Sequence, residues 1–227
     1  MRQILRSLCL LAFFVGAVAM MPQKKTRVVF FGDSITQAGV QGEGYINQLG
    51  GLLQQKGLAD QYELIGAGIG GNKVYDLYLR MDEDVLAKNP DVVVIWVGVN
   101  DVWHKSSSGT GTDPDKFQRF YEAILKKLQA KGIRTVLVTP AAIGERTDFT
   151  NQQDGDLNLY STFIRNLAVK YNTGLVDLRK VFLDYNLKNN PENKPSGILT
   201  TDRVHLNKTG NALVAEQMLP AITANNK

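Results

Sequence analysis

Short apolar runs alternate with amphipathic segments along almost the whole chain. The runs have the length and β-branched composition of buried strands, and they stand at 26–34, 62–68, 90–101, 134–142 and 173–178. Segments with apolar residues at helical spacing lie at 44–57, 73–88, 113–132, 157–172 and 208–222. Continuous apolar strands separated by helices are typical of a parallel sheet covered on both faces. We therefore predict a single three-layer α/β/α domain over residues 20–227, with loops at 105–113 and 186–200.

The first residues have a different character. Arg2 and Arg6 precede an apolar stretch from Leu8 to Val18, and Ala17-Val18-Ala19 matches a small-residue cleavage pattern. The stretch is too short to span a bilayer comfortably. Residues 1–19 are therefore predicted to be a secretory signal peptide cut after about Ala19, with an uncleaved anchor as the alternative. Cleavage implies a secreted or periplasmic protein without stable membrane insertion.

The composition excludes several kinds of chemistry. Cys9, the one cysteine, lies in the predicted signal peptide, and the chain has two histidines, His104 and His205. The mature protein is thus expected to lack disulfides, thiolate catalysis and a metal site, and to need no cofactor. Without Arg2 and Arg6 the formal charge falls from +4 to +2, because 24 basic residues then face 22 acidic ones. That balance is too small to indicate a nucleic-acid partner.

Gly66, Gly68 and Gly71 spell the G-x-G-x-x-G pattern of dinucleotide-binding folds. That pattern closes the first strand of such folds, whereas here it follows the second. The expected ribose-binding acid is also misplaced, since Asp91 stands before the apolar residues 92–97 and so lies at the opposite end of the sheet. Nucleotide binding is therefore disfavoured. The glycines are expected to let the backbone approach another group closely.

Polar residues follow the apolar runs, and ligands of parallel sheets bind at the carboxyl ends of the strands. Ser34 follows Gly32-Asp33 at a strand-to-helix turn, where a serine hydroxyl is exposed beside helix N-terminal N–H groups. The alternative is that Asp33 and Ser34 only cap the helix. Asn100 follows the third run, so its side-chain amide is predicted to point into the crevice.

Asp202 and His205 stand three residues apart, just before the last helical segment. In a turn, this spacing lets the carboxylate accept from Nδ1–H of the imidazole and leaves Nε2 free to take a proton from a serine. His104 is a competing histidine that the sequence does not exclude.

Four motifs together resemble the blocks of the SGNH, or GDSL-type, esterases and lipases. They are FFGDSIT, GIGGN, VGVND and TDRVHL, in the order and spacing of that family, and the resemblance covers residues 27–222. It implies a flavodoxin-like sheet with strand order 2-1-3-4-5. The family's functional residues, carried over by motif, fall on Ser34, Gly71, Asn100 and His205, with Asp202 completing the catalytic set.

These residues imply hydrolysis of carboxylic esters through an acyl-serine. Ser34 is the expected nucleophile, and an oxyanion hole is expected from the Ser34 and Gly71 N–H groups and the Asn100 amide. Asp33, Tyr45 and Trp103 are weaker candidates for substrate contact, with ordinary packing as the alternative for Trp103.

The chain is too short, by the standards of this family, to include a large lid, so a fairly open cleft is expected. An open cleft in a secreted protein favours acetyl esters on oligo- or polysaccharides as substrates. A lipase, lysophospholipase or thioesterase is the second possibility. An inactive carbohydrate-binding relative is the non-enzyme alternative. The oligomeric state is not predicted.

Overall fold

A computed structural model describes residues 24–224, so the predicted signal peptide with Cys9 lies outside the described residues. The strands are β1 (Thr26–Gly32), β2 (Tyr62–Gly68), β3 (Val92–Trp96), β4 (Arg134–Val138) and β5 (Gly174–Val176). They form one parallel sheet in the order β2-β1-β3-β4-β5. This is the predicted order.

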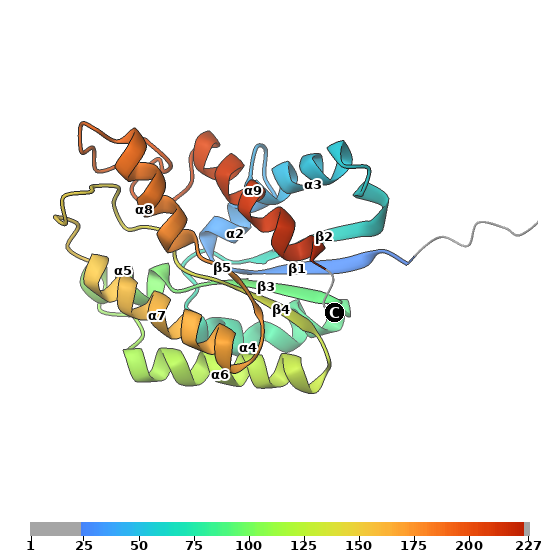
Figure 1. The fold of residues 1–227 in the computed structure, drawn as a ribbon. Helices are drawn as coiled ribbons and strands as arrows, with labels where there is room; N and C mark the ends of the chain where they lie inside the picture. Colours follow the sequence, from blue (N-terminus) through green and yellow to red (C-terminus); the bar gives the residue numbers. More distant parts are fainter. Residues whose placement is uncertain (1–23, 225–227) are drawn as a thin grey trace, which may run out of the picture.

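Helices cover both faces of the sheet (Figure 1). α3 and α9 pack together on one face, and α4, α6 and α7 lie on the other. The three-layer prediction is confirmed. The helices are α2 (Ser34–Gly39), α3 (Tyr45–Gln55), α4 (Val74–Asp84), α5 (Val99–Ser107), α6 (Pro114–Ala130), α7 (Asp154–Lys170), α8 (Leu178–Asn189) and α9 (Lys208–Thr223), with short 3₁₀ turns η1 (Ala59–Gln61) and η2 (Leu86–Lys88).

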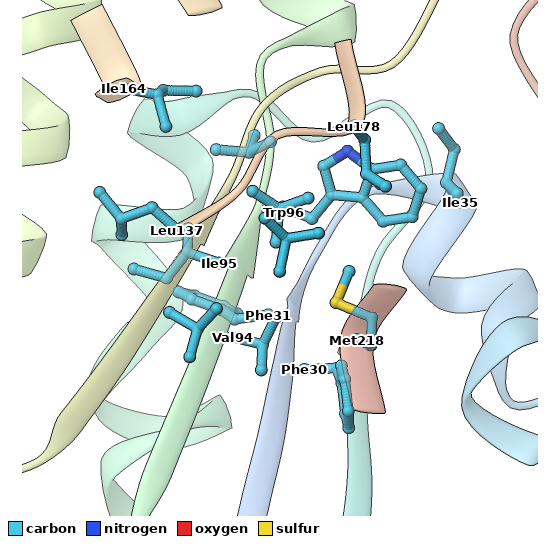
Figure 2. Packing of buried hydrophobic residues seen from close by; sticks show 14 of the residues in the cluster. Phe30, Phe31, Ile35, Val94, Ile95, Trp96, Leu137, Ile164, Leu178 and Met218 are labelled. Carbon is cyan, nitrogen blue, oxygen red and sulfur yellow. The ribbon is translucent and has the colours of Figure 1, made fainter. Parts of the chain in front are cut away.

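The central strands are apolar because they are buried on both sides. Side chains of residues 28–31 in β1 and 92–96 in β3 are at most 3% exposed. They belong to one cluster with Ile164 of α7, Leu178 of α8 and Met218 of α9, drawn in Figure 2. A fully buried side chain of this size stabilises the fold by roughly 1.5–3 kcal/mol. This core makes the sheet a rigid base for the residues beyond its strand ends.

Three predicted boundaries are wrong. The run at 90–101 is a strand only to Trp96, since Gly98 has φ +131° and α5 begins at Val99. The first residues of the predicted loop at 105–113 belong to the end of α5, and those of the predicted loop at 186–200 belong to the last turn of α8. Apolar residues continue from β3 into α5, so the apolar run alone did not reveal where the strand stopped.

Gly68 lets α2 begin directly above the end of β2. A Cβ on Gly68 would lie 2.1 Å from the Gln37 nitrogen, 2.5 Å from the Thr36 carbonyl carbon and 2.7 Å from the Asp33 oxygen. All three are backbone atoms, which cannot turn aside as a side chain can. The expected close approach of the glycine segment is therefore an approach to the helix that carries Ser34.

We predict that Gly68→Ala lowers the free energy of unfolding by about 2 kcal/mol or more, because the added methyl must displace backbone. Urea denaturation measures the change. Gly51→Ala is the control: it lies within α3 with no atom within 4 Å of the added Cβ, and it should stabilise by about 0.5–1 kcal/mol. A Gly68→Ala protein as stable as the parent would contradict the close-approach explanation.

Candidate active site

Three strand ends meet at one edge of the sheet. Gly32 at the end of β1 pairs with Gly68 of β2 and with Trp96 of β3. The segments that follow these strands therefore begin side by side. They carry Ser34, Gly71 and Asn100, so parallel register brings the three motifs to one place.

A hydrogen-bonded chain joins Ser34 to His205 and Asp202. The Ser34 Oγ lies 2.9 Å from His205 Nε2, and His205 Nδ1 lies 2.7 Å from Asp202 Oδ2. The other carboxylate oxygen, Oδ1, accepts the backbone N–H groups of His205 at 2.8 Å and Val204 at 3.1 Å. An imidazole that donates from Nδ1 to the carboxylate has Nε2 available to accept the serine proton.

Asp202 is held in its charged form. Burial acts to raise the pKa of Asp202, but the hydrogen bonds from the His205 ring and from the His205 and Val204 N–H groups outweigh it and lower that pKa below its ordinary value. A carboxylate that stays ionised stabilises positive charge on the neighbouring imidazole. The geometry and the charge of Asp202 thus both suit a residue that orients the His205 imidazole and stabilises its protonated form.

The turn after β2 presents a backbone N–H group toward the same edge. Gly71 has φ +75°, a conformation that favours glycine. Within residues 24–224 its N–H has no hydrogen-bond acceptor, whereas the Gly70 N–H donates to Gln37 Oε1 at 2.9 Å. A Cβ on Gly70 would lie 3.9 Å from the Ser34 Cβ, so the turn lies against the serine.

Asn100 is oriented by two further residues that the sequence analysis did not select. Its Nδ2 donates to the Asn72 carbonyl at 3.1 Å and keeps a second N–H. Arg80 of α4 holds the Asn72 side chain with Nε at 2.7 Å, and its Nη2 donates to the carbonyls of Gly32 at 2.7 Å and Ala67 at 3.0 Å. One guanidinium thus ties the ends of β1 and β2 to the segment that positions Asn100.

His104 is not the partner of Ser34, which hydrogen-bonds to His205 instead. It lies on α5 near Gly71, where a Cβ would be 3.9 Å from the His104 ring. Burial, with a smaller contribution from the Lys73 ammonium, lowers the pKa of His104. The ambiguity between the two histidines is resolved by the turn that brings the C-terminal loop over the sheet edge.

Two predicted substrate contacts are corrected. Tyr45 is fully buried, packs edge-to-face against Phe30 and Trp96, and hydrogen-bonds Thr36 through its hydroxyl. Asp33 is 2% exposed, and its Oδ1 accepts the Ile35 N–H as the N-cap of α2. Both side chains are buried, so neither is accessible to a substrate. The sequence analysis did not detect that the residues flanking Ser34 pack inward.

Trp103 does lie at the surface beside the site. Its ring is 6.5 Å from the His205 ring, centroid to centroid, at 66°. It borders a cleft of about 530 Å³. The other lining residues are Ser106 and Ser107 of α5, Ile143, Arg146, Thr150, Asn151, Gln152 and Gln153 between β4 and α7, and Pro195 and Arg203 between α8 and α9.

The segment 139–153 is the main cleft wall that the sequence analysis missed. The expected loops contribute only Ser106, Ser107 and Pro195. The sequence signal for this wall is that residues 145–153, in the connection after a buried strand, are all polar or charged except Phe149. Loops at the carboxyl ends of strands carry function in such folds.

Glu145 joins this segment to the loop that precedes Asp202. Its side chain is 1% exposed, and Oε1 accepts the N–H groups of Leu199 and Thr200, each at 2.7 Å. Oε2 accepts the Ile198 N–H at 2.8 Å. Three charge-assisted hydrogen bonds therefore hold the loop on which the Asp202–His205 pair depends.

Buried acids lie beneath the serine. Burial raises the pKa of Asp33 to about 7; the Ile35 N–H and His205 act against this rise, and the Asp101 carboxylate adds to it. Burial also raises the pKa of Asp101 to about 6, while its hydrogen bond from the Val74 N–H, at 3.1 Å, acts to lower it. Asp101, which lies on α5, thus accepts a hydrogen bond from the first residue of α4.

Residues 24–224 contain neither a metal-binding cluster nor a membrane-spanning helix. No group of three or more His, Cys, Asp or Glu side chains is arranged to hold a metal ion. No helix combines the length and the apolar character that crossing a membrane requires.

With this geometry established, comparison with known proteins identifies the family. Residues 30–213 match the model of the GDSL-like Lipase/Acylhydrolase family. The chain belongs to this family. The predicted resemblance is confirmed, and so is the prediction of a carboxylic ester hydrolase.

Proteins similar to this chain include acetylxylan esterases. The acetylxylan esterase of Geobacillus stearothermophilus is 31% identical over 216 residues, which cover 86% of this chain and 93% of the relative. The crystal structure of the acetyl xylan esterase AlAXEase is 66% identical, with a TM-score of 0.85 over 86% of this chain and 99% of that one. The structure of Axe2, an acetylxylan esterase from Geobacillus stearothermophilus, has a TM-score of 0.77 at 26% identity, over 91% and 98% of the two chains.

We predict that Glu145→Gln lowers the free energy of unfolding by about 1–3 kcal/mol, since an amide group replaces one carboxylate acceptor. The kcat for p-nitrophenyl acetate should fall more than KM changes, because the loop before Asp202 and His205 loosens. The control is Glu192→Gln, an exposed residue of the connection between α8 and α9 that is paired with Lys194, and it should change stability by less than about 0.5 kcal/mol. Equal effects in the two variants would contradict the positioning role.

The raised pKa of Asp33 predicts how stability depends on pH. The folded protein keeps a proton on Asp33 up to about pH 7, whereas the ordinary carboxyl value is 3.8. The stability contributed by the neutral acid is therefore fully present below about pH 4 and is lost as pH rises toward 7. The measurement is the midpoint of urea denaturation between about pH 4 and 7, which should fall as pH rises. Asp33→Asn, which keeps an oxygen for the Ile35 N–H, should make this fall shallower.

Asp115→Asn, on the exposed surface of α6, is the control and should leave the pH dependence unchanged. An Asp33→Asn protein whose midpoint falls with pH as steeply as the parent's would show that the buried acid is not the cause.

Proposed function

We propose that the protein removes acetyl groups from acetylated carbohydrates, with acetylated xylan and its oligosaccharides as the first substrate class. The observation that carries the proposal is the chain from Asp202 through His205 to the Ser34 hydroxyl. The likeness to acetylxylan esterases, at 66% identity for AlAXEase, supports the substrate class.

In the proposed mechanism, His205 Nε2 removes the proton of Ser34 Oγ as that oxygen attacks the ester carbonyl. The resulting imidazolium then gives the proton to the leaving sugar oxygen, and the acetyl group stays on Ser34. Water, deprotonated by the same imidazole, attacks the acetyl-serine, and the imidazolium returns the proton to Ser34 Oγ as the acyl bond breaks and acetate leaves. Asp202 holds the imidazole in the required tautomer and stabilises its positive charge.

Negative charge on the carbonyl oxygen is stabilised, in this proposal, by three donors. They are the Ser34 N–H at the start of α2, the Gly71 N–H, which has no other acceptor within residues 24–224, and the second N–H of Asn100. A donor of this kind is worth on the order of 10²–10³ in kcat. The hydrogen bond from Asn100 to Asn72 supports its part, because it orients the amide before the substrate binds.

The character of the cleft beside Trp103 favours a sugar over a long acyl chain. Its lining is mostly amide, hydroxyl and guanidinium groups, with one half-buried aromatic ring, that of Trp103, next to His205. Aromatic rings with polar neighbours suit carbohydrate faces and hydroxyls, whereas a long acyl chain needs an apolar channel. A lipase or thioesterase activity is therefore the second candidate. We also propose that residues 20–227 form the mature domain and act outside the cytoplasm.

The proposal is tested by acyl-chain preference. Purified protein should release acetate from acetylated xylan and should hydrolyse p-nitrophenyl acetate faster than p-nitrophenyl octanoate. Ser34→Ala should abolish the burst of p-nitrophenol and lower kcat by about 10³-fold or more. A preference for the octanoate ester would overturn the acetyl-carbohydrate assignment. Undiminished activity in Ser34→Ala would overturn the serine mechanism.

A further inference from the structure

The cleft beside the site carries a pair of positive charges. Arg146 and Arg203 are its charged lining residues, and they come from two different connections, 139–153 and 190–207. The Gly144 N–H donates to the Arg203 carbonyl at 2.9 Å and joins these connections. The backbones that carry the two arginines are therefore held together at this cleft.

Neither guanidinium is neutralised by an acid within residues 24–224. Arg146 donates through Nη1 to Thr150 Oγ1, at 3.3 Å, and Arg203 has no side-chain hydrogen bond or ion pair there. The acids adjacent in the chain have other partners: Glu145 accepts backbone N–H groups of residues 198–200, and Asp202 is hydrogen-bonded to His205. Asp148, two residues from Arg146, accepts hydrogen bonds from Thr150 and Asn193. Both cleft arginines thus have donors available for an anion.

Arg203 occupies a strained backbone position. Its φ is +84°, in the region that favours glycine, and it stands between Asp202 and His205. Such a conformation costs a side-chain-bearing residue energy that glycine would not lose, and strain of this kind gathers at functional sites. The strain places a guanidinium at the cleft, one residue from the carboxylate that orients His205.

The other residues that line the cleft indicate which kind of anionic ligand it would bind. Trp103 lies against the His205 ring and continues into the cleft, and Asn151, Gln152 and Gln153 supply amide groups. A sugar ring next to the acetylated unit would lie on the indole face and use these amides for its hydroxyls. A planar carboxylate on that sugar is the anion that a guanidinium binds with two parallel hydrogen bonds.

We propose that this cleft is a subsite for a carboxylate-bearing sugar, with Arg146 and Arg203 as residues that determine specificity. The enzyme then acts faster on acetyl groups beside a uronic acid substituent than on the same groups in a neutral chain. This inference rests on the proposed deacetylation of carbohydrates and adds the class of substrate that the site selects.

The test compares acetylated xylo-oligosaccharides with and without a uronic acid substituent. The parent protein should have a higher kcat/KM for the acidic substrate, and added salt should reduce that preference. Arg146→Ala with Arg203→Gly should lower the ratio of acidic to neutral kcat/KM by about tenfold or more, as expected for lost charge-assisted hydrogen bonds. Glycine is chosen at 203 because it relieves the backbone strain, so misfolding does not confuse the result.

Arg119→Ala, on the exposed surface of α6 and outside the cleft, is the matched control for charge. It should keep both the ratio and the activity on p-nitrophenyl acetate. Calorimetric titration of Ser34→Ala with a deacetylated acidic xylo-oligosaccharide gives a readout independent of turnover. The acidic oligosaccharide should bind more tightly than the neutral one, and its affinity should fall when the two arginine substitutions are added to Ser34→Ala.

The outcomes separate the two proposals. Release of acetate from both substrates with equal kcat/KM, or a preference that survives the loss of both arginines, would overturn the subsite and leave the esterase assignment intact. Failure to release acetate from either oligosaccharide, with hydrolysis of longer acyl esters, would overturn the proposed function itself.

Discussion

The parallel register of β2, β1 and β3 is the constraint on which the rest of the structure depends. Gly32 stands opposite both Gly68 and Trp96, so three connections leave the sheet at one edge. The missing side chain of Gly68 lets α2 approach the end of β2 at backbone contact distance. Arg80 then ties the carbonyls of Gly32 and Ala67 together. The serine and the donors expected around it are thereby held by the core rather than by flexible loops.

The acid and the histidine reach this edge by a different route. Asp202 and His205 lie in an irregular segment before α9, and no strand holds them. Glu145 holds this segment in place instead, because its buried carboxylate accepts hydrogen bonds from the three N–H groups of residues 198–200. The site thus has one half built on the sheet and another tied to the connection after β4. The same connection forms most of the cleft wall, so the site and its cleft share one anchor.

Sequence patterns predicted local features well and inward packing poorly. The Asp202–His205 pair was predicted because a turn of three residues determines their contact, and the strand order followed from the family resemblance. Tyr45 and Asp33 were wrong as substrate contacts, since nothing in a linear pattern says which side of a turn faces the core. Arg80, Asn72 and Glu145 were missed for a related reason. Their hydrogen bonds join segments that are distant in the sequence, and each residue alone resembles an ordinary polar side chain.

The sequence by itself determined the alternation of strands and helices, the serine at the first strand end, and the acid–histidine turn, because each depends on neighbouring residues or on apolar periodicity. Only the tertiary structure decided which histidine meets Ser34, where the strand before Asn100 stops, and that Arg146 and Arg203 line one cleft. These depend on how connections cross the sheet edge, and the crossing is determined by long-range packing and by buried hydrogen bonds such as those of Glu145.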